Sequence, residues 1–150
     1  MAEEPTYFKQ PGLPTRLFNR LVMGITRLGI GPAGARSLTV VGRKSGKPFT
    51  TPVNPLDLDG RTYIVSPRGN TQWSRNLRSV GEGELRLGRK ARSFRGEEVA
   101  NADKLPILKA YLDKWAWEVG AFFNLPKDPT DEQIAAEAPN HPVFRVSFTS

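Results

Sequence analysis

The segment Gly42–Gly46, with the sequence GRKSG, places two cations, a hydroxyl and two glycines within five residues. Glycines allow backbone N–H groups to approach a ligand closely, and a guanidinium can bind a phosphate through two parallel hydrogen bonds. These residue types are typical of an anion-binding turn. It is not a Walker A loop, because the chain has no G-x-x-x-x-G-K-[ST] pattern. A basic hairpin turn that is only solvated is the alternative interpretation.

Several kinds of catalytic chemistry are excluded by the composition. The chain contains no cysteine and one histidine, His141. Thiolate metal sites, iron–sulfur clusters, disulfides and cysteine nucleophiles are therefore excluded, and a metal site is not expected. A Ser-His-Asp triad would have to use His141, which lies between two prolines before a predicted strand, so we expect a structural or solvent-facing imidazole. With no nucleophile and base in evidence, a redox cofactor is easier to credit than hydrolysis.

The 150 residues suit one domain, with 38% apolar residues for a single core. We expect an N-terminal amphipathic helix and linker over residues 1–35, and a barrel with helices over residues 36–150. The net charge of +7 is uneven, since residues 61–95 carry nine Lys/Arg and two Asp/Glu, whereas residues 96–150 carry five and nine. The basic middle of the chain would attract an anionic ligand, an anionic membrane surface or nucleic acid.

The N-terminal region offers no targeting signal. The first residues are acidic and lack an apolar stretch, and no apolar run approaches 18 residues, so we predict a cytoplasmic protein. Residues 15–28 form a predicted basic amphipathic helix with leucines and an isoleucine on one face. This helix could pack on the domain or dock on a membrane surface. Peripheral membrane association through residues 15–28 therefore stays open.

Short strands dominate the rest of the chain. Alternating and β-branched runs predict strands over residues 37–42, 47–57, 62–65, 84–88, 91–95 and 143–148. Capping residues and helical periodicity predict helices over residues 71–80, 103–119 and 130–138. Antiparallel hairpins with few helices favour an α+β, mainly β fold, a small barrel with helices over its openings. A Rossmann fold is disfavoured, because no G-x-G-x-x-G opens a helix.

Several motifs occur in a specific order: Gly42–Gly46, then Pro52, then Asn54-Pro55, then Ser66–Arg78 with the sequence SPRGNTQWSRNLR. Together they resemble the deazaflavin-dependent nitroreductase and quinone reductase family of actinobacteria, over about residues 36–100 and more loosely over residues 138–145. The resemblance implies an FMN-binding split-barrel-like fold that binds the 8-hydroxy-5-deazaflavin coenzyme (F-420). It also implies hydride transfer from the reduced coenzyme to quinones, nitroaromatics or coumarin-type enones.

The resemblance also implies roles for particular residues. The basic turn would hold the phosphate and polyglutamate tail, and the loop after the strand predicted at residues 62–65 would line the deazaflavin ring. The strand predicted at residues 47–57 would face both. The implied cofactor-binding residues are Arg43, Lys44, Ser45, Gly46, Thr50, Pro52, Asn54, Ser66, Pro67, Arg68, Gly69, Trp73 and Asn76. Relatives shape the acceptor pocket with C-terminal tyrosines, so the candidates here are Tyr111, Trp115 and Trp117. The catalytic group itself stays unassigned.

Three other functions remain as alternatives. A non-catalytic lipid or membrane-surface binder could share the fold. A flavin mononucleotide enzyme would need only one phosphate clamp, whereas residues 36–95 offer a longer cationic track. Nucleic-acid binding is disfavoured, because no RNP-type aromatic pattern or helix-turn-helix signature occurs. We expect the basic residues Arg86, Arg89, Arg92 and Arg95 to form a solvated strand face, and the oligomeric state stays open.

Overall fold

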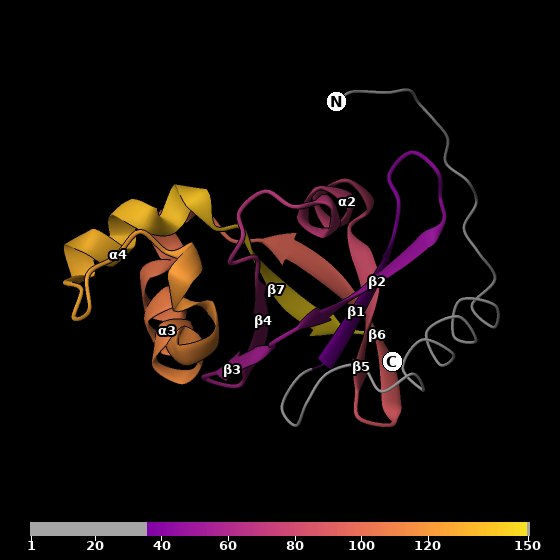
Figure 1. The fold of residues 1–150 in the computed structure, drawn as a ribbon. Coiled ribbons are helices and arrows are strands. Elements are labelled where there is room, and N and C mark those ends of the chain that lie inside the picture. Colours follow the sequence, from indigo (N-terminus) through magenta and orange to yellow (C-terminus); the bar gives the residue numbers. More distant parts are fainter. Residues whose placement is uncertain (1–35, 150) are drawn as a thin grey trace.

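The computed structural model describes residues 36–149 (Figure 1). The predicted helix over residues 15–28 lies outside the described residues, as does the rest of the predicted N-terminal segment.

Seven antiparallel strands form one curled sheet (Figure 1). Their order across the sheet is β2-β1-β5-β6-β7-β4-β3. The strands are β1 (Arg36–Val41), β2 (Pro48–Val53), β3 (Leu56–Leu58), β4 (Arg61–Val65), β5 (Glu82–Leu87), β6 (Lys90–Glu98) and β7 (Val143–Phe148). The curled sheet confirms the predicted split barrel of the α+β, mainly β class.

One predicted strand is wrong in its extent. The sequence predicted a single strand over residues 47–57, but β2 ends at Val53 and β3 begins at Leu56. Pro55 has no N–H to donate to a ladder, so the chain turns at Asn54 and Pro55 instead of continuing. Since β2 and β3 are the two edges of the sheet, this short link carries the chain directly from one edge to the other.

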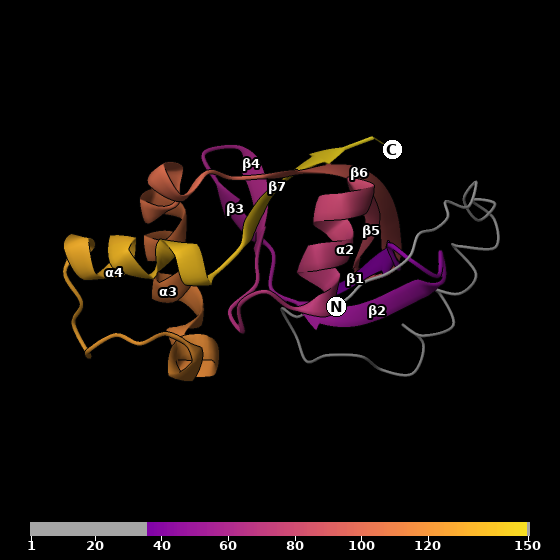
Figure 2. The same cartoon turned by 90° about the horizontal axis from the view of Figure 1, so that it is seen from above.

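Helices lie against two different parts of the sheet (Figure 2). Helix α2 (Gln72–Val80) packs on β1 and β6, whereas α3 (Leu105–Val119) packs on β3 and β4 and also contacts α4 (Asp131–Glu137). Short 3-10 turns are η1 (Asn101–Asp103), η2 (Gly120–Phe122) and η3 (Ala138–Asn140). Local signals explain the helix ends: Thr130 and Gln133 form a capping box at the start of α4, and Gly81 ends α2 with a left-handed φ of 85°.

The buried side chains form two separate clusters. One lies under α2 and includes Leu38, Leu77 and Phe144. The other lies under α3 and α4 and includes Tyr111 and Val143. Since the sheet runs through both clusters, the region between α2 and α3 is where a cavity can open without breaking either core.

The predicted solvated face of the β5–β6 hairpin is wrong for Arg86. Its side chain is only 6% exposed, and its Nη1 donates to the backbone oxygen of Arg89 at 2.7 Å. Arg92 is half-buried, with its guanidinium 3.9 Å from the centre of the Phe148 ring. Arg89 and Arg95 are exposed as expected. The tight hairpin turn brings a backbone acceptor within reach of Arg86, which an alternation pattern does not reveal.

Within residues 36–149, none of the helices has the length and apolar content needed to cross a membrane.

Candidate functional site

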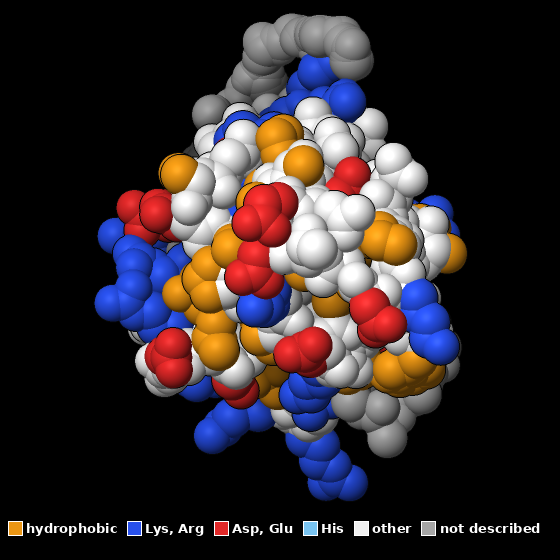
Figure 3. All heavy atoms as spheres, turned by 90° about the vertical axis from the view of Figure 1, so that its left-hand side faces the viewer, with side chains coloured by type: hydrophobic (Ala, Val, Ile, Leu, Met, Phe, Trp, Pro, Cys, Tyr) orange, Lys and Arg blue, Asp and Glu red, His pale blue; other side chains and the backbone are white. Residues whose placement is uncertain are grey.

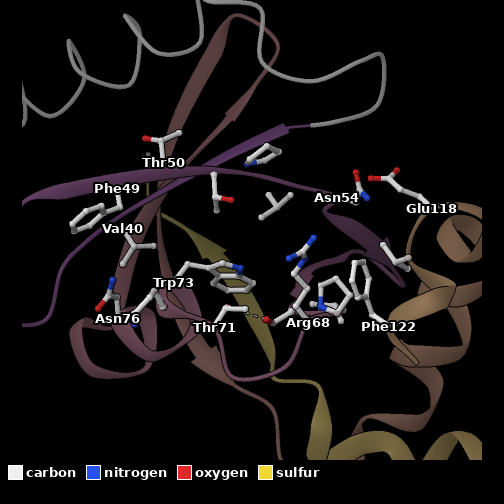
Figure 4. Close-up of a pocket in the computed structure, with 18 of the residues that line it drawn as sticks. Val40, Phe49, Thr50, Asn54, Arg68, Thr71, Trp73, Asn76, Glu118 and Phe122 are labelled. Atoms are coloured by element: carbon white, nitrogen blue, oxygen red, sulfur yellow. Dashed lines mark hydrogen bonds between the residues drawn. The ribbon is translucent and has the colours of Figure 1, made fainter. Parts of the chain in front are cut away.

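A cavity of about 750 Å³ opens between β2, the loop after β4, the start of α2 and the end of α3 (Figure 4). Both core clusters reach it, through Val40 and Val53 on one side and Val65 and Val119 on the other. The size is suited to a small organic molecule or cofactor, and the wall mixes apolar surface with a few polar groups.

The basic turn 42–46 is fixed against α2 at one edge of this cavity. The backbone N–H of Arg43 donates to Oδ1 of Asn76 at 3.1 Å, and its Nη1 donates to the same oxygen at 2.7 Å and to Oε1 of Gln72 at 3.1 Å. Asn76 and Gln72 both line the cavity. The turn is closed by a bond from the Gly46 N–H to the Gly42 oxygen at 2.9 Å, and Gly46 has a φ of 72°. The turn is therefore a rigid cationic edge of the cavity and not part of its wall.

The loop Ser66–Thr71 forms the floor of the cavity. The Ser66 hydroxyl donates to the Gly69 backbone oxygen at 2.5 Å and lies 3.0 Å from the Thr71 hydroxyl. Gly69 has a φ of 95°, and an added Cβ would lie 3.3 Å from the Asn140 backbone oxygen. A side chain at this position would therefore be strained and crowded. These contacts constrain the loop, and Pro67 and Arg68 line the cavity from it.

Aromatic and cationic side chains divide the cavity. The Trp73 ring lines the wall and is held 5.9 Å from the ring of the buried Phe144. The Arg68 guanidinium lies 4.7 Å from the centre of the Phe122 ring. Figure 4 shows Arg68 pointing into the space between Trp73 and Phe122. The side near Asn76 is thus separated from the side near α3 by a cation over an aromatic ring.

A polar group occupies the end of the cavity near α3. Tyr111 is buried, and this burial raises the pKa of its hydroxyl above the ordinary value. The negative charge of Glu118 raises that pKa further, whereas a hydrogen bond with Asn54 acts in the opposite direction. Figure 4 shows the side chains of Asn54 and Glu118 pointing toward each other. The Tyr111 hydroxyl therefore keeps its proton near neutral pH and can donate it in a hydrogen bond.

The three acceptor-pocket candidates from the sequence differ in position. Only Tyr111 lines the cavity. Trp115 is buried in the core under α3, and Trp117 is 77% exposed with its ring 6.3 Å from the Trp115 ring. Trp115 thus contributes to packing and Trp117 to the surface, and Tyr111 is the one of the three that lies at the cavity.

His141 is structural, one of the two expected alternatives. It is buried, its ring stacks on Phe123 at 3.9 Å, and both ring nitrogens contact oxygen acceptors. Among residues 36–149, no group of three or more His, Cys, Asp or Glu side chains could hold a metal ion.

A protein-family model described as F420H(2)-dependent quinone reductase matches residues 24–118, more than half of the 150 residues. The chain belongs to this family. As a member it is a deazaflavin-dependent reductase. No curated protein matches the chain.

Solved structures of other proteins share the fold of this reductase. An F420-H2 dependent reductase (FDR-A) is 16% identical, with a TM-score of 0.54 and coverage of 77% of this chain and 95% of its own. A FAD-binding protein from Mesorhizobium loti is 15% identical (TM-score 0.51; coverage 92% and 91%). A putative pyridoxamine 5'-phosphate oxidase from Listeria innocua is 10% identical (TM-score 0.54; coverage 89% and 94%). At these identities the likeness supports the split-barrel fold alone.

The reductase brings most of the residues implied by the resemblance to one cavity. The implied residues that line it are Thr50, Pro52, Asn54, Ser66, Pro67, Arg68, Trp73 and Asn76. Gly69 belongs to the floor loop without lining the cavity, and the turn residues Arg43, Lys44, Ser45 and Gly46 lie outside the wall. Of these four, Arg43 bonds to two residues that line the cavity, Gln72 and Asn76.

Sequence reasoning missed the other residues of the wall. These are Val40, Phe49, Thr51, Val53, Val65, Thr71, Gln72, Glu118, Val119 and Phe122. One signal could have found two of them: Glu118 and Val119 lie seven and eight positions after Tyr111, which places them near its helix face. The valines carry no such signal, because apolar residues in strands predict only a core.

Proposed function

We propose that this reductase transfers a hydride from the reduced 8-hydroxy-5-deazaflavin coenzyme to an electrophilic small molecule of the quinone, nitroaromatic or enone type. One observation carries this proposal, namely the polarity of the cavity. A fixed cationic turn flanks one end, and a buried tyrosine with an amide and a carboxylate lines the other. An elongated cofactor with an acidic tail and an uncharged reactive ring matches this polarity.

The tail of the coenzyme would bind at the basic turn. Arg43 and Lys44 supply positive charge, and Ser45 and Gly46 supply a hydroxyl and a backbone N–H in a turn with a left-handed residue. Within the described residues, both side-chain bonds of Arg43 to Gln72 and Asn76 come from Nη1. Its other N–H groups are therefore available for a phosphate or carboxylate.

The ring of the coenzyme would bind over the floor loop. Ser66, Pro67 and Arg68 present this loop to the cavity, and Trp73 adds a flat apolar wall. Thr50, Pro52 and Asn54 line the cavity from β2 and the link that follows it. A flat, mostly apolar ring is suited to such a slot between backbone and aromatic surface.

When bound, the reduced coenzyme supplies the hydride, and the acceptor takes up that hydride together with a proton. The protein's own contribution is to hold the acceptor and to stabilise negative charge that develops on its oxygen. We assign the second task to Tyr111, because it lines the cavity and its hydroxyl keeps its proton and has a hydrogen bond with Asn54. Proton-retaining donors of this kind lower the barrier without changing their own charge.

The experiment that tests the proposal measures binding and turnover separately. The intrinsic fluorescence of the protein is titrated with the coenzyme, and the reduced coenzyme is then offered with a panel of quinones, nitroaromatics and enones. We expect micromolar or tighter binding and oxidation of the coenzyme by at least one class of acceptor. Absence of binding at micromolar coenzyme would overturn the proposal. Binding without turnover across the panel would overturn the acceptor classes alone.

Flavin mononucleotide is the second cofactor candidate, because two structures with the same fold are named for FAD binding and pyridoxamine phosphate oxidation. Reconstitution of the protein with each cofactor separates the two. We expect tighter retention of the deazaflavin, since the turn with Arg43 and Lys44 suits a tail with several negative charges. Preferential retention of flavin mononucleotide would reverse this assignment.

A non-catalytic lipid-surface binder is the second candidate function, and one observation favours it. The exposed large apolar residues of the described chain are Phe49, Trp117 and Phe122, exposed by 58%, 77% and 42%. Phe49 and Phe122 lie at the cavity itself. Co-sedimentation with anionic vesicles at low and high salt tests this function, including any contribution of residues 15–28. Binding to vesicles without any affinity for the coenzyme would favour it over the reductase proposal.

A further inference from the structure

The only histidine of the chain lies between two oxygen acceptors. Its Nδ1 is 2.9 Å from the backbone oxygen of Pro67, and its Nε2 is 2.9 Å from Oε1 of Glu137. A backbone oxygen can only accept a hydrogen bond, so Nδ1 must carry a proton. The second contact then also needs a proton, either on Nε2 or on the carboxyl group. His141 and Glu137 together therefore hold one more proton than a neutral imidazole beside a carboxylate.

The surroundings of Glu137 place this extra proton on the ring. The carboxylate accepts two further hydrogen bonds, from the backbone N–H of Asn124 at 3.1 Å and from Nδ2 of Asn140 at 3.4 Å. Burial raises the pKa of Glu137, but the hydrogen bonds from His141 and Asn124 outweigh it and hold that pKa below the ordinary value. An ionised carboxylate next to a doubly protonated imidazole follows from these contacts.

This pair is connected to the floor of the cavity on both sides. Pro67 lines the cavity and receives the Nδ1 hydrogen bond, and the neighbouring Ser66 N–H donates to the Pro142 backbone oxygen at 2.9 Å. The crowding of Gly69 against Asn140 lies on the same side of the loop. Residues 137–142 therefore hold the loop that faces the cavity from behind.

We propose that His141 is a positioning residue, whose ion pair with Glu137 fixes the Pro67 carbonyl and thereby the loop on which the coenzyme ring binds. The role in binding depends on the function proposed above, whereas the state of the ion pair does not. No other described side chain donates a hydrogen bond to the Pro67 backbone oxygen.

Loss of the extra proton should release the loop. A neutral imidazole carries one N–H, and the charged Glu137 carboxylate attracts it more strongly than the neutral Pro67 carbonyl does. The single proton therefore moves to Nε2, and a bare Nδ1 then faces the Pro67 oxygen, lone pair against lone pair. We expect the loop to be held at pH values where the ring is doubly protonated and to loosen above them.

Other charged groups near the His141–Glu137 pair affect how strongly the ring holds its second proton. Lys104 is buried, and its Nζ donates to the backbone oxygens of Ala138 at 2.9 Å and His141 at 3.0 Å, so its positive charge opposes a protonated ring. Burial lowers the pKa of Lys104 while the charge of Glu98 raises it and that of Arg78 lowers it. Glu137 favours the protonated ring and Lys104 disfavours it, with Glu98 and Arg78 acting through Lys104.

Nitrogen NMR of the ligand-free, untagged protein tests the ion pair directly, since the chain contains one histidine and the spectrum shows one imidazole. With the hydrogen bonds of the structure in place, we expect both ring nitrogens to carry protons. On raising the pH we expect a single transition that leaves the proton on Nε2. A ring that is singly protonated at Nδ1 throughout would overturn the proposal.

Two variants separate the contacts of the ring, because each keeps one of them. The amide of His141→Asn can replace Nδ1 and still donate to Pro67, whereas that of His141→Gln can replace Nε2 and donate only to Glu137. We expect His141→Gln to weaken coenzyme binding by about 3- to 10-fold, the factor of one lost hydrogen bond, with a smaller loss in His141→Asn. Binding by the wild type should weaken above the NMR transition, and His141→Asn should lack this dependence.

Equal losses in both variants, in step with their thermal stability, would show that the ring only fills space and would overturn the proposal. Equal binding by all three proteins would overturn it as well. If the wild type does not bind the coenzyme at all, the function proposed above fails, and the NMR measurement still decides whether the pair holds the proton. In that case the NMR chemical shifts of the backbone amides next to Pro67, measured in both variants, replace coenzyme binding as the readout of the loop.

Discussion

Removal of the Asn76 amide should separate the basic turn from α2. Asn76 is buried, and its Oδ1 accepts both the backbone N–H and Nη1 of Arg43, at 3.1 and 2.7 Å. In Asn76→Ala both donors lose this acceptor. A neutral bond contributes about 1 kcal/mol and a bond to a charged group about 1.5–3 kcal/mol. The half-buried Arg43 side chain can recover water, so we expect a total loss of about 2 kcal/mol in the free energy of unfolding. For a chain of this size that loss lowers the melting temperature by roughly 4–8 °C.

Asn76→Asp is the matched control for this change. The carboxylate keeps an acceptor in the same place and adds an ion pair with Arg43, so we expect stability at or above that of the wild type. It also places a negative charge beside the turn that would hold an acidic tail. Both variants should therefore weaken coenzyme binding, but only Asn76→Ala should lose stability.

Urea unfolding gives the stability of the three proteins, and fluorescence quenching gives their affinity for the coenzyme. An unfolding free energy of Asn76→Ala within about 0.5 kcal/mol of the wild type, the ordinary range for surface substitutions, would show that the bonds to Arg43 do not hold the turn. Unchanged coenzyme affinity in Asn76→Asp would show that the acidic tail binds elsewhere.

Three further predictions concern other parts of the molecule. Lys44→Ala should weaken coenzyme binding by about 1–3 kcal/mol for one lost charged contact, as measured by fluorescence quenching. Arg95→Ala, at an exposed position, is the control. Equal effects of the two substitutions would show that Lys44 acts only through the overall positive charge of the protein and not through a direct contact. Tyr111→Phe should leave coenzyme affinity unchanged and lower kcat/KM by about tenfold, the factor of 1.4 kcal/mol for a lost donor; unchanged steady-state turnover would remove Tyr111 from the chemistry. The hydrogen bond from Arg78 at 2.6 Å lowers the pKa of Glu98. The stabilisation of the fold by this bond is therefore present above the ordinary pKa of a glutamate and is lost as the pH falls through the lower folded pKa. Because both groups are partly exposed, we expect this ion pair to contribute about 0.3–1 kcal/mol to the free energy of unfolding. Urea unfolding at low and neutral pH should therefore show a smaller acid-induced loss of stability in Glu98→Gln than in the wild type.

Local signals in the sequence predicted those parts of the fold that local physics decides. Helix α2 begins after Thr71 and ends at Gly81, as the cap residue and the glycine indicated. The burial of Arg86 was not predictable, because it depends on a backbone oxygen that only the closed hairpin turn brings near. The break between β2 and β3 could have been predicted from Pro55, because a residue without an N–H interrupts a ladder even among β-branched neighbours.

The candidate site divides in the same way. Most implied residues of the floor loop and β2 line one cavity, because each group is contiguous in sequence and the sheet brings the groups together. The docking of α3 and η2 against the sheet was not predictable, although the spacing from Tyr111 could have placed Glu118 and Val119 near its helix face. Glu118 and Phe122 face the cavity only because α3 packs on β3 and β4, and nothing local determines that docking. Trp117 was expected at the acceptor pocket, but it lies one position before Glu118 on the helix and is 77% exposed.

The two halves of the chain place opposite charges at the cavity. The basic turn and Arg68 come from its first part, whereas Glu118 comes from residues 96–150, where nine acidic residues outnumber five basic ones. Figure 3 shows the helical side of the molecule as a mixture of red, blue and orange with no large area of one charge. The charge that matters for orientation is therefore local. A ligand with an acidic tail is attracted toward Arg43 and repelled by Glu118, so its uncharged end is left beside Tyr111. Glu118→Lys reverses the charge at that end. This substitution should thus weaken the preference of the ligand for one orientation, with little effect on the fold.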